Sequence, residues 1–449
     1  MVRSESWMSD TERRDVLKMA GGTALAAALA GCSGFLGEES VEQPAEDADV
    51  PDEPVQIGAQ TFIEGAASVL GQDHIPGYEI AVDRINEAGG IAGREVELEI
   101  VEEGEGAVEN YERFVDQGKD VVIGLVSSGS STAVGPVAED RGTIHITVDG
   151  ATVDLYEEVV PDPQYMFRVN PPDVGEAVMA AVDAVERLGG PDQIDTYASV
   201  NQNYTWGQTQ HRQFTAAFEQ LTGAELVYEG FPEQGAEDYS THVEAVTSEE
   251  PDMIFSSHWG GDLVLLMRQF AEGGGFEAVD LFEGSLGTSI LSEVDASEVD
   301  EWGEVAMGGR TYIMGNPPDN RYPPGAELRQ EVLDRGFEDI MPLTGSMNNA
   351  YAAITWYATA AEKAVARLGR WPSDEELAEF MSGHAYWTPA GFHYSTPESY
   401  NGRQGYTSVH QGLVQTEGGD VIMDDVNTFD PTEVTPPPGM MAADWIDGW

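Results

Sequence analysis

Short apolar runs alternate with amphipathic stretches along most of this chain, and this alternation constrains the fold more than any other feature. Runs rich in Val, Ile and Phe indicate strands, and apolar residues spaced three and four apart indicate helices. The expected strands are 55–60, 95–101, 120–126, 143–148, 194–200, 225–230, 252–257, 279–283 and 305–313, with helices at 75–88, 108–117, 132–141, 174–188, 206–221, 239–247 and 262–272. Such a rhythm predicts parallel sheets with right-handed crossovers.

The rhythm is interrupted once, at residues 164–172. This segment reads as extended and ends in Pro171 and Pro172, which a helix does not cross. Because the alternation restarts directly afterwards, we predict an α/β fold of two doubly wound, parallel-sheet lobes. Farther along, helices are expected at 326–337, 347–368 and 373–381, short β segments at 391–394 and 405–414, and irregular structure at 435–449.

Residues 1–32 are typical of an export signal. Arg13 and Arg14 stand in Thr-Glu-Arg-Arg-Asp-Val-Leu-Lys, which resembles the twin-arginine motif, and a weakly apolar stretch follows at 19–31. As a helix that stretch spans only ~20 Å, less than a hydrocarbon core of ~30 Å. Cys32, the only cysteine, directly follows Leu-Ala-Gly in a segment that resembles a lipobox, so we expect it to be lipidated. The Glu-, Asp- and Pro-rich residues 33–54 predict a flexible acidic tether.

The net charge excludes some partners and indicates a solvent. The chain has 81 acidic and 21 basic residues, which gives a formal charge of −60. Nucleic acid and anionic membrane surfaces need clustered cations, so neither is expected as a partner. At about 1 M salt the Debye length is ~3 Å and surface repulsion is screened. The composition therefore indicates a high-salt solvent and resembles that of haloarchaeal proteins, the alternative being an ordinary acidic protein.

The sequence carries no recognisable catalytic signature. Ser285 stands outside a GxSxG frame, and HExxH, P-loop and CxxC motifs are absent. The segment 103–109 begins like a dinucleotide-binding loop but lacks the third glycine. The eight histidines are scattered, and a single cysteine permits neither a disulfide within the chain nor a thiolate metal site. We therefore expect no enzyme, no catalytic residues, no cofactor and no metal.

Binding signatures are stronger, because ligands of doubly wound sheets lie beyond the carboxyl ends of the strands. Loops rich in small polar or aromatic residues follow five expected strands, at 127–131, 149–152, 201–207, 256–262 and 283–285. In the first, Ser127 and Ser128 precede a helix start whose free N–H groups suit a carboxylate or amide oxygen. The alternative is ordinary helix capping.

Aromatic residues in two of these loops suggest a lid over the ligand. Tyr204, Trp206 and Trp259 can close over an apolar ligand or stack on an amine, or they are half-buried core aromatics.

Four segments carry a resemblance to a known family. The first is 77–94, which begins Gly-Tyr-Glu-Ile and ends Gly-Gly-Ile-Ala-Gly-Arg, and the second is 122–136, which begins Val-Ile-Gly and ends in Pro136. The others are Phe-Arg-Val-Asn-Pro at 167–171 and Asn-Tyr-Thr-Trp-Gly at 203–207. Their order is similar to the type I periplasmic-binding-protein family, in its leucine/isoleucine/valine, amide and urea branch. The resemblance covers about residues 55 to 418. It implies a first lobe of 55–170 plus 310–386, a second of 171–309 plus 387–430, and a tail at 431–449, with crossovers near Asn170, Gly309 and Trp387.

The resemblance also implies roles for single residues. Ser127, Ser128 and the backbone around Gly129 and Ser130 would hold a ligand carboxylate or amide. Gly150 and Thr152 would meet an amino group, and Trp206 would close from the second lobe. The acidic residue that fixes an ammonium in amino-acid binders falls near Leu286, with Glu283 as the nearest carboxylate, and the loop 63–71 lacks the usual Tyr. These departures favour an amide, urea-like or other small carboxylate ligand.

The function implied by the resemblance is that of a monomeric solute receptor of an ABC importer, lipid-anchored on the outer face of the cell membrane. It would close on a small solute and dock on a two-subunit permease. The alternative is a sensory protein that presents its solute to a membrane signal transducer.

Overall fold

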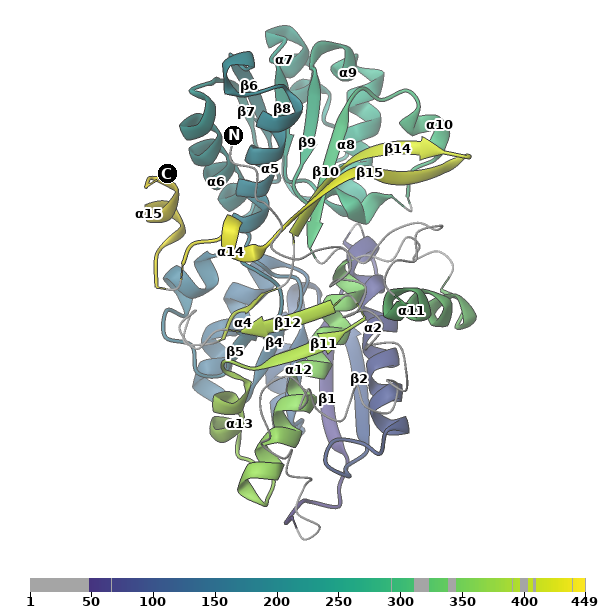
Figure 1. Cartoon of the computed structure of the whole chain (residues 1–449), viewed down its shortest axis with the longest axis vertical. Helices are drawn as coiled ribbons and strands as arrows, with labels where there is room; N and C mark the ends of the chain where they lie inside the picture. The colour runs from purple at the N-terminus through teal and green to yellow at the C-terminus, as the bar shows by residue number, and fades with distance from the viewer. Residues whose placement is uncertain are drawn as a thin grey trace, which may run out of the picture.

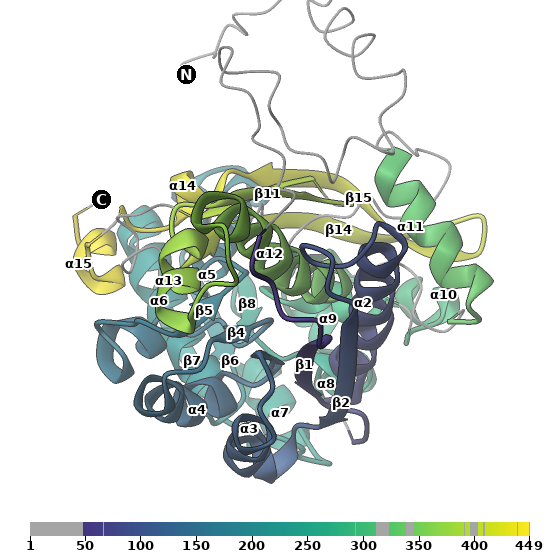
Figure 2. The same cartoon turned by 90° about the horizontal axis from the view of Figure 1, so that it is seen from below.

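The first lobe is built on a five-stranded, all-parallel sheet. Its order is β2 (Val96–Glu102), β1 (Val55–Thr61), β3 (Val121–Gly124), β4 (His145–Thr147) and β5 (Met166–Arg168). Helices α2 (Ser68–Glu87) and α12 (Gly345–Leu368) pack on one face, and α3 (Ala107–Asp116) and α4 (Ser128–Arg141) on the other (Figure 2). Because both faces are covered, β1 is buried at almost every residue.

The second lobe contains a seven-stranded mixed sheet in the order β15-β14-β10-β9-β8-β6-β7. Five strands are parallel: β6 (Thr196–Val200), β7 (Glu225–Gly230), β8 (Met253–Ser256), β9 (Leu281–Gly284) and β10 (Val305–Arg310). The hairpin of β14 (Val409–Glu417) and β15 (Asp420–Phe429) adds to β10 in antiparallel orientation. Helices α5 (Val174–Arg187) and α6 (Thr205–Thr222) cover one face, and α7 (Ser240–Glu249) and α8 (Gly260–Glu272) the other. The prediction of two α/β lobes is thus confirmed (Figure 1).

The structure is a computed structural model that describes residues 48–65, 67–291, 293–310, 323–337, 345–389, 391–395, 403–406, 409–437 and 439–448. The export motif with Arg13 and Arg14, the expected lipidation site Cys32 and tether residues 33–47 lie outside these ranges. No helix within them is long and apolar enough to cross a membrane.

The chain returns to the second lobe later than the resemblance implied. Helices α11 (Pro323–Asp334) and α13 (Asp374–Met381) precede a three-stranded antiparallel sheet of β11 (Ala385–Thr388), β12 (Gly391–Ser395) and β13 (Gly405–Tyr406). Tyr386 on β11 belongs to the core that contains α12, and Gln404 forms a bridge with Arg168 of β5. Residues 387–389, 391–395 and 403–406 therefore lie with the first lobe, and the second-lobe sheet resumes at Val409.

Both ends of the described chain are held against the body. The backbone N–H of Asp49, which falls in the predicted tether, donates to the carbonyl of Gly369 at 2.9 Å, and the N–H of Trp371 donates to the Asp49 carbonyl at 3.0 Å. The expectation of an irregular end is wrong for α15 (Ala442–Ile446), whose Ala442 and Ile446 are buried in the α5–α6 core. Nearby, α14 (Pro431–Val434) packs against α5.

Most expected elements are found within a few residues, and the largest differences have local causes. Helix α2 begins at Ser68, seven residues before the expected start at 75, and continues through Pro76. Strand β15 was not predicted, since most of its residues are partly exposed and it lacks a buried apolar run. Its turn uses Gly418 and Gly419, whose φ angles of 67° and 98° suit a tight hairpin.

Candidate functional site

Apolar and aromatic side chains from both lobes meet in one buried group, which we call the interlobe cluster. The first lobe contributes Phe62, Ala67, Leu70, Val126 and Ala151, and the second contributes Tyr204, Trp206, Trp259 and Leu286. These residues follow strands β1, β3, β4, β6, β8 and β9, so the carboxyl ends of both sheets face each other here. The convergence of loops expected from the sequence is therefore present.

The two tryptophans are held at this interface by their indole N–H groups. Trp206 is 2% exposed and donates to the carbonyl of Ser257 at 2.9 Å, and Trp259 is 4% exposed and donates to the Tyr204 hydroxyl at 2.7 Å. They belong to the interlobe cluster rather than to the two cores of the second lobe. The two indole rings therefore pack where the lobes meet.

The first-lobe loop, residues 126–131, occupies the expected place at the start of α4, but its donors have partners within the chain. The Ser127 hydroxyl accepts from the N–H groups of Gly129 at 3.2 Å and Ser130 at 3.5 Å. This is the capping role that the sequence left open as an alternative. Ser128 is 3% exposed at the first position of the helix.

The loop after β4 packs directly on the first-lobe loop. A Cβ atom on Gly150 would lie 1.9 Å from the Ser131 hydroxyl oxygen, so only glycine allows this approach. Thr152 is fully buried; its hydroxyl accepts from the Asp154 N–H at 3.2 Å and its carbonyl accepts from Arg168 at 2.7 Å. The structure thus brings Gly150 close to the serine loop and holds Thr152 through its own chain.

Sequence reasoning missed Glu103, which lies beneath the first-lobe loop. Its side chain is 1% exposed, and its two carboxylate oxygens accept from the N–H groups of Val126 at 2.7 Å and Ser127 at 3.0 Å. Burial raises the pKa of Glu103 to about 7, although these N–H groups and the Ser130 hydroxyl lower it. With 81 carboxylates in the chain, nothing in the sequence marks this one.

Glu283 is buried on β9, and its described hydrogen bond stays within the second lobe. One carboxylate oxygen accepts from the Gln411 side chain at 2.5 Å. Burial raises its pKa strongly, and the charge of Asp183 adds to this while Arg187 opposes it. Glu283 therefore belongs to a polar group under α5 rather than to the interlobe cluster.

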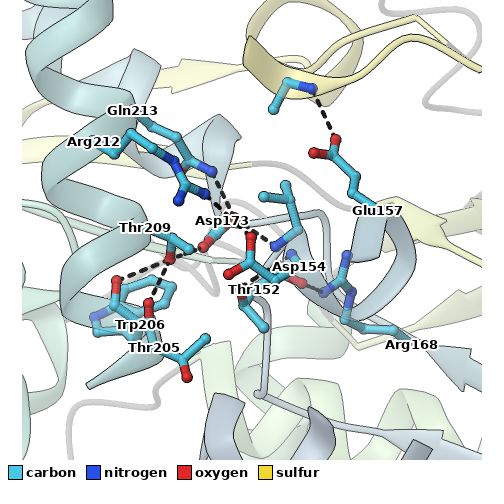
Figure 3. A network of polar contacts seen from close by, with 12 residues as sticks. Thr152, Asp154, Glu157, Arg168, Asp173, Thr205, Trp206, Thr209, Arg212 and Gln213 are labelled. Atoms are coloured by element: carbon cyan, nitrogen blue, oxygen red, sulfur yellow. Dashed lines mark hydrogen bonds and ion pairs between the residues drawn. The ribbon is translucent and has the colours of Figure 1, made fainter. Parts of the chain in front are cut away.

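Asp173 connects the first crossover to both lobes (Figure 3). Its carboxylate accepts from the N–H of Val153 at 3.0 Å, the hydroxyl of Thr209 at 2.6 Å and the amide of Gln213 at 3.2 Å. Burial raises its pKa, and these donors and Arg168 lower it. Because Val153 follows Thr152 in the first lobe while Thr209 and Gln213 lie on α6 with Trp206, this carboxylate joins the first crossover to residues of both lobes.

Two unpartnered hydroxyls were also missed. The side-chain oxygens of Ser257 and Ser285 are buried and have no hydrogen-bond partner among the described residues. They follow the neighbouring strands β8 and β9, in which Ser256 pairs with Gly284. Such hydroxyls can donate to or accept from a ligand. Both serines stood in loops that the sequence selected, without a signal that set them apart.

Thr61, His74 and Asp149 each lie within hydrogen-bonding distance of the next, in the order of a catalytic triad, but they do not form one. Thr61 Oγ1 lies 3.1 Å from His74 Nδ1, and His74 Nε2 lies 2.9 Å from Asp149. The Thr61 hydroxyl donates its proton to the carbonyl of Gly71 at 2.7 Å and is fully buried, so it offers no nucleophile. Among the described residues no His, Cys, Asp and Glu cluster suits a metal ion.

Comparisons with known proteins agree with this architecture. Residues 54–411 match the family model described as periplasmic binding protein. A Leu/Ile/Val-binding protein homolog of Brucella abortus is 28% identical over 255 residues, which make up 54% of this chain and 60% of the relative. The chain thus spans about three fifths of that relative's length. A second homolog from the same organism is 25% identical over 337 residues, covering 67% of this chain and 76% of the relative.

Solved structures share the fold at low sequence identity. A solute binding protein of an ABC transporter from Rhodopseudomonas palustris, in complex with p-hydroxybenzoic acid, has a TM-score of 0.69 and 16% identity, covering 85% of this chain and 98% of that one. A leucine binding protein from Thermotoga maritima has a TM-score of 0.66 and 19% identity, covering 84% and 99%. Since the family model matches most of its length, this chain belongs to the periplasmic binding protein family.

Proposed function

We propose that this protein is the solute receptor of an ABC importer, which captures a small solute between its lobes by hinge closure and delivers it to a permease. The observation that carries the proposal is the interlobe cluster, in which Trp206 and Trp259 face Leu70 and Val126 of the other lobe. A solute that contacts both walls binds the closed state better than the open one, which is the differential affinity that closure needs.

The cluster favours a solute with a compact apolar part. Its lining is aromatic and aliphatic. The unpartnered hydroxyls belong to Ser257, two residues before Trp259, and to Ser285, directly before Leu286. The relatives named above are Leu/Ile/Val-binding homologs, a p-hydroxybenzoic acid complex and a leucine binding protein, all of which concern small carboxylates with an apolar group. We propose an amino-acid, amide or small aromatic solute. A thermal-shift screen of these classes and of urea, in about 1 M salt, tests the function; no stabilisation by any class would contradict it.

Trp259→Ala is expected to weaken binding of any solute that the screen identifies by about 30-fold, which corresponds to roughly 2 kcal/mol. The change removes the aromatic wall and the hydrogen bond from the indole N–H to the Tyr204 hydroxyl. Titration calorimetry measures the effect. Trp387→Ala is the matched control, since Trp387 is 50% exposed on β11 and should leave affinity unchanged. Equal affinities of the two variants would show that the interlobe cluster does not contact the solute.

The membrane attachment is part of the same proposal and rests on the amino-terminal motif. We propose export through Arg13 and Arg14, lipidation at Cys32 and a monomeric receptor on the outer face of the membrane. Cys32→Ser is expected to move the protein from the membrane fraction to the medium, as measured by fractionation and immunoblotting. Retention of the variant in the membrane fraction would rule out the lipid anchor. Neighbouring permease and ATPase genes, rather than a transducer gene, would favour import over sensing.

A further inference from the structure

The carboxylate of Glu103 occupies the donor groups that the first-lobe loop would otherwise offer to a ligand. Its two oxygens accept from the consecutive N–H groups of Val126 and Ser127, and the Ser130 hydroxyl also bonds to it. The next N–H groups, of Gly129 and Ser130, are directed to the Ser127 hydroxyl. The N–H groups of Val126, Ser127, Gly129 and Ser130, four of the five from 126 to 130, therefore have partners within the chain.

This arrangement is built into the backbone. At the end of β3 the chain passes through positive φ at Gly124 (124°) and then at Leu125 (72°), a conformation that costs a non-glycine residue roughly 1 kcal/mol or more. The bend precedes the two N–H groups that meet Glu103, which itself follows β2 on the other side of β1. Two strands and a strained turn thus converge on one carboxylate, whose partner Val126 belongs to the interlobe cluster.

We propose that Glu103 is a specificity-determining residue, which makes the first-lobe wall select a solute that presents a hydrogen-bond donor, such as an amide or ammonium group, over one that presents a carboxylate. The inference rests on the proposed function and narrows its solute class. A solute carboxylate at this wall would lie near the negative charge of Glu103 and would find the loop donors already engaged, whereas an amide or ammonium group would meet no such repulsion.

The same geometry predicts when a carboxylate solute is accepted. Protonation of Glu103 removes the charge that repels a nearby carboxylate, so such a solute is expected to bind with uptake of a proton by Glu103. The charged and titratable groups near Glu103 are Glu102, which precedes it, and the Tyr78 hydroxyl on α2. Because burial raises the pKa of Glu103 to about 7, the residue is ionised above that pH and neutral below it. Discrimination against carboxylate solutes should therefore be strong above about pH 7 and weak below it.

Two probe pairs with equal apolar groups test this inference: benzamide against benzoate, and isovaleramide against isovalerate. In about 1 M KCl near pH 8, the wild-type protein is expected to bind each amide about tenfold or more tightly than its carboxylate. Glu103→Gln, which keeps the size of the side chain and removes its charge, should reduce that ratio about tenfold. Glu105→Gln makes the same charge change at an exposed position of the same segment and should preserve the ratio.

A pH series separates selectivity from a general effect on folding. The wild-type ratio should fall as pH decreases from about 8 to about 5.5, while that of Glu103→Gln stays flat. If Glu103 had only a structural role, the wild-type protein and Glu103→Gln would show the same pH dependence of the amide-to-carboxylate affinity ratio. Carboxylates bound as well as amides near pH 8, equal ratios for the two variants, or no binding of any of the four probes would overturn the inference. If only this inference fails, other solutes of the wider screen still raise the melting temperature of the protein. If the proposed function fails, no solute raises it.

Discussion

Transfer of the protein from about 1 M or more KCl into dilute buffer is expected to unfold it. The chain carries a net charge of −60, so its folded surface concentrates negative charge that only counterions screen. At about 1 M salt the Debye length is ~3 Å, and at 0.01 M it is ~30 Å, comparable with the size of a lobe. Far-UV circular dichroism along a KCl series measures the transition.

A second series distinguishes screening from a general stabilising effect of solutes. Sucrose at matched osmolality strengthens burial without screening charge, so it should not replace KCl. A cooperative, salt-independent melting curve in dilute buffer would contradict the proposed high-salt solvent. If sucrose restored the folded state as well as KCl does, the effect of salt would be due to hydration rather than to charge screening.

Asp173→Ala is expected to cost about 4 kcal/mol of unfolding free energy, because it leaves buried donors without an acceptor at roughly 1–3 kcal/mol each. Two buried donors lose their acceptor, the N–H of Val153 and the amide of Gln213. The hydroxyl of Thr209 loses its 2.6 Å bond to Asp173 but keeps the carbonyls of Thr205 and Trp206 as acceptors. Asp173 itself is fully buried. Urea unfolding in high salt measures the loss.

The matched control for this variant is Asp192→Ala, at an exposed position within the short 3-10 helix Pro191–Gln193 of the second lobe. It also removes one negative charge and should change the unfolding free energy by less than about 0.5 kcal/mol. Asp173→Asn tests the role of the charge, since the amide keeps the shape and one acceptor but places a donor against a donor. A loss below about 1 kcal/mol for Asp173→Ala would mean that the N–H of Val153 and the amide of Gln213 find water or other partners.

The parts of the site predicted from the sequence are those that follow directly from strand order. Trp206 and Trp259 stand just after expected strands, and carboxyl ends of parallel strands meet at one edge of a sheet, so their place between the lobes was foreseeable. The same reasoning placed Ser127 and Gly150 next to each other. What it could not decide was whether the Ser127 hydroxyl faces a ligand or its own helix, since both uses need the same residue at the same position.

The unpredicted parts depend on contacts that are distant in sequence. Glu103 reaches N–H groups 23 and 24 residues ahead, which only the strand order β2-β1-β3 brings near. Asp173 accepts hydrogen bonds from Thr209 and Gln213 only because α6 packs against the first crossover. The late return to the second lobe has a similar cause, because β11 and β12 pair with each other and no local signal indicates which lobe they join.

The contact of Asp49 with Gly369 and Trp371 has a mechanical consequence. The amino-terminal segment joins the first lobe through backbone hydrogen bonds just after the carboxyl end of α12. The other end of α12 carries Asn349, which bonds to Asp149. Any pull on that segment, from a surface attachment or an optical trap, is therefore taken up by one lobe. The second lobe carries no load from that pull and remains free to swing.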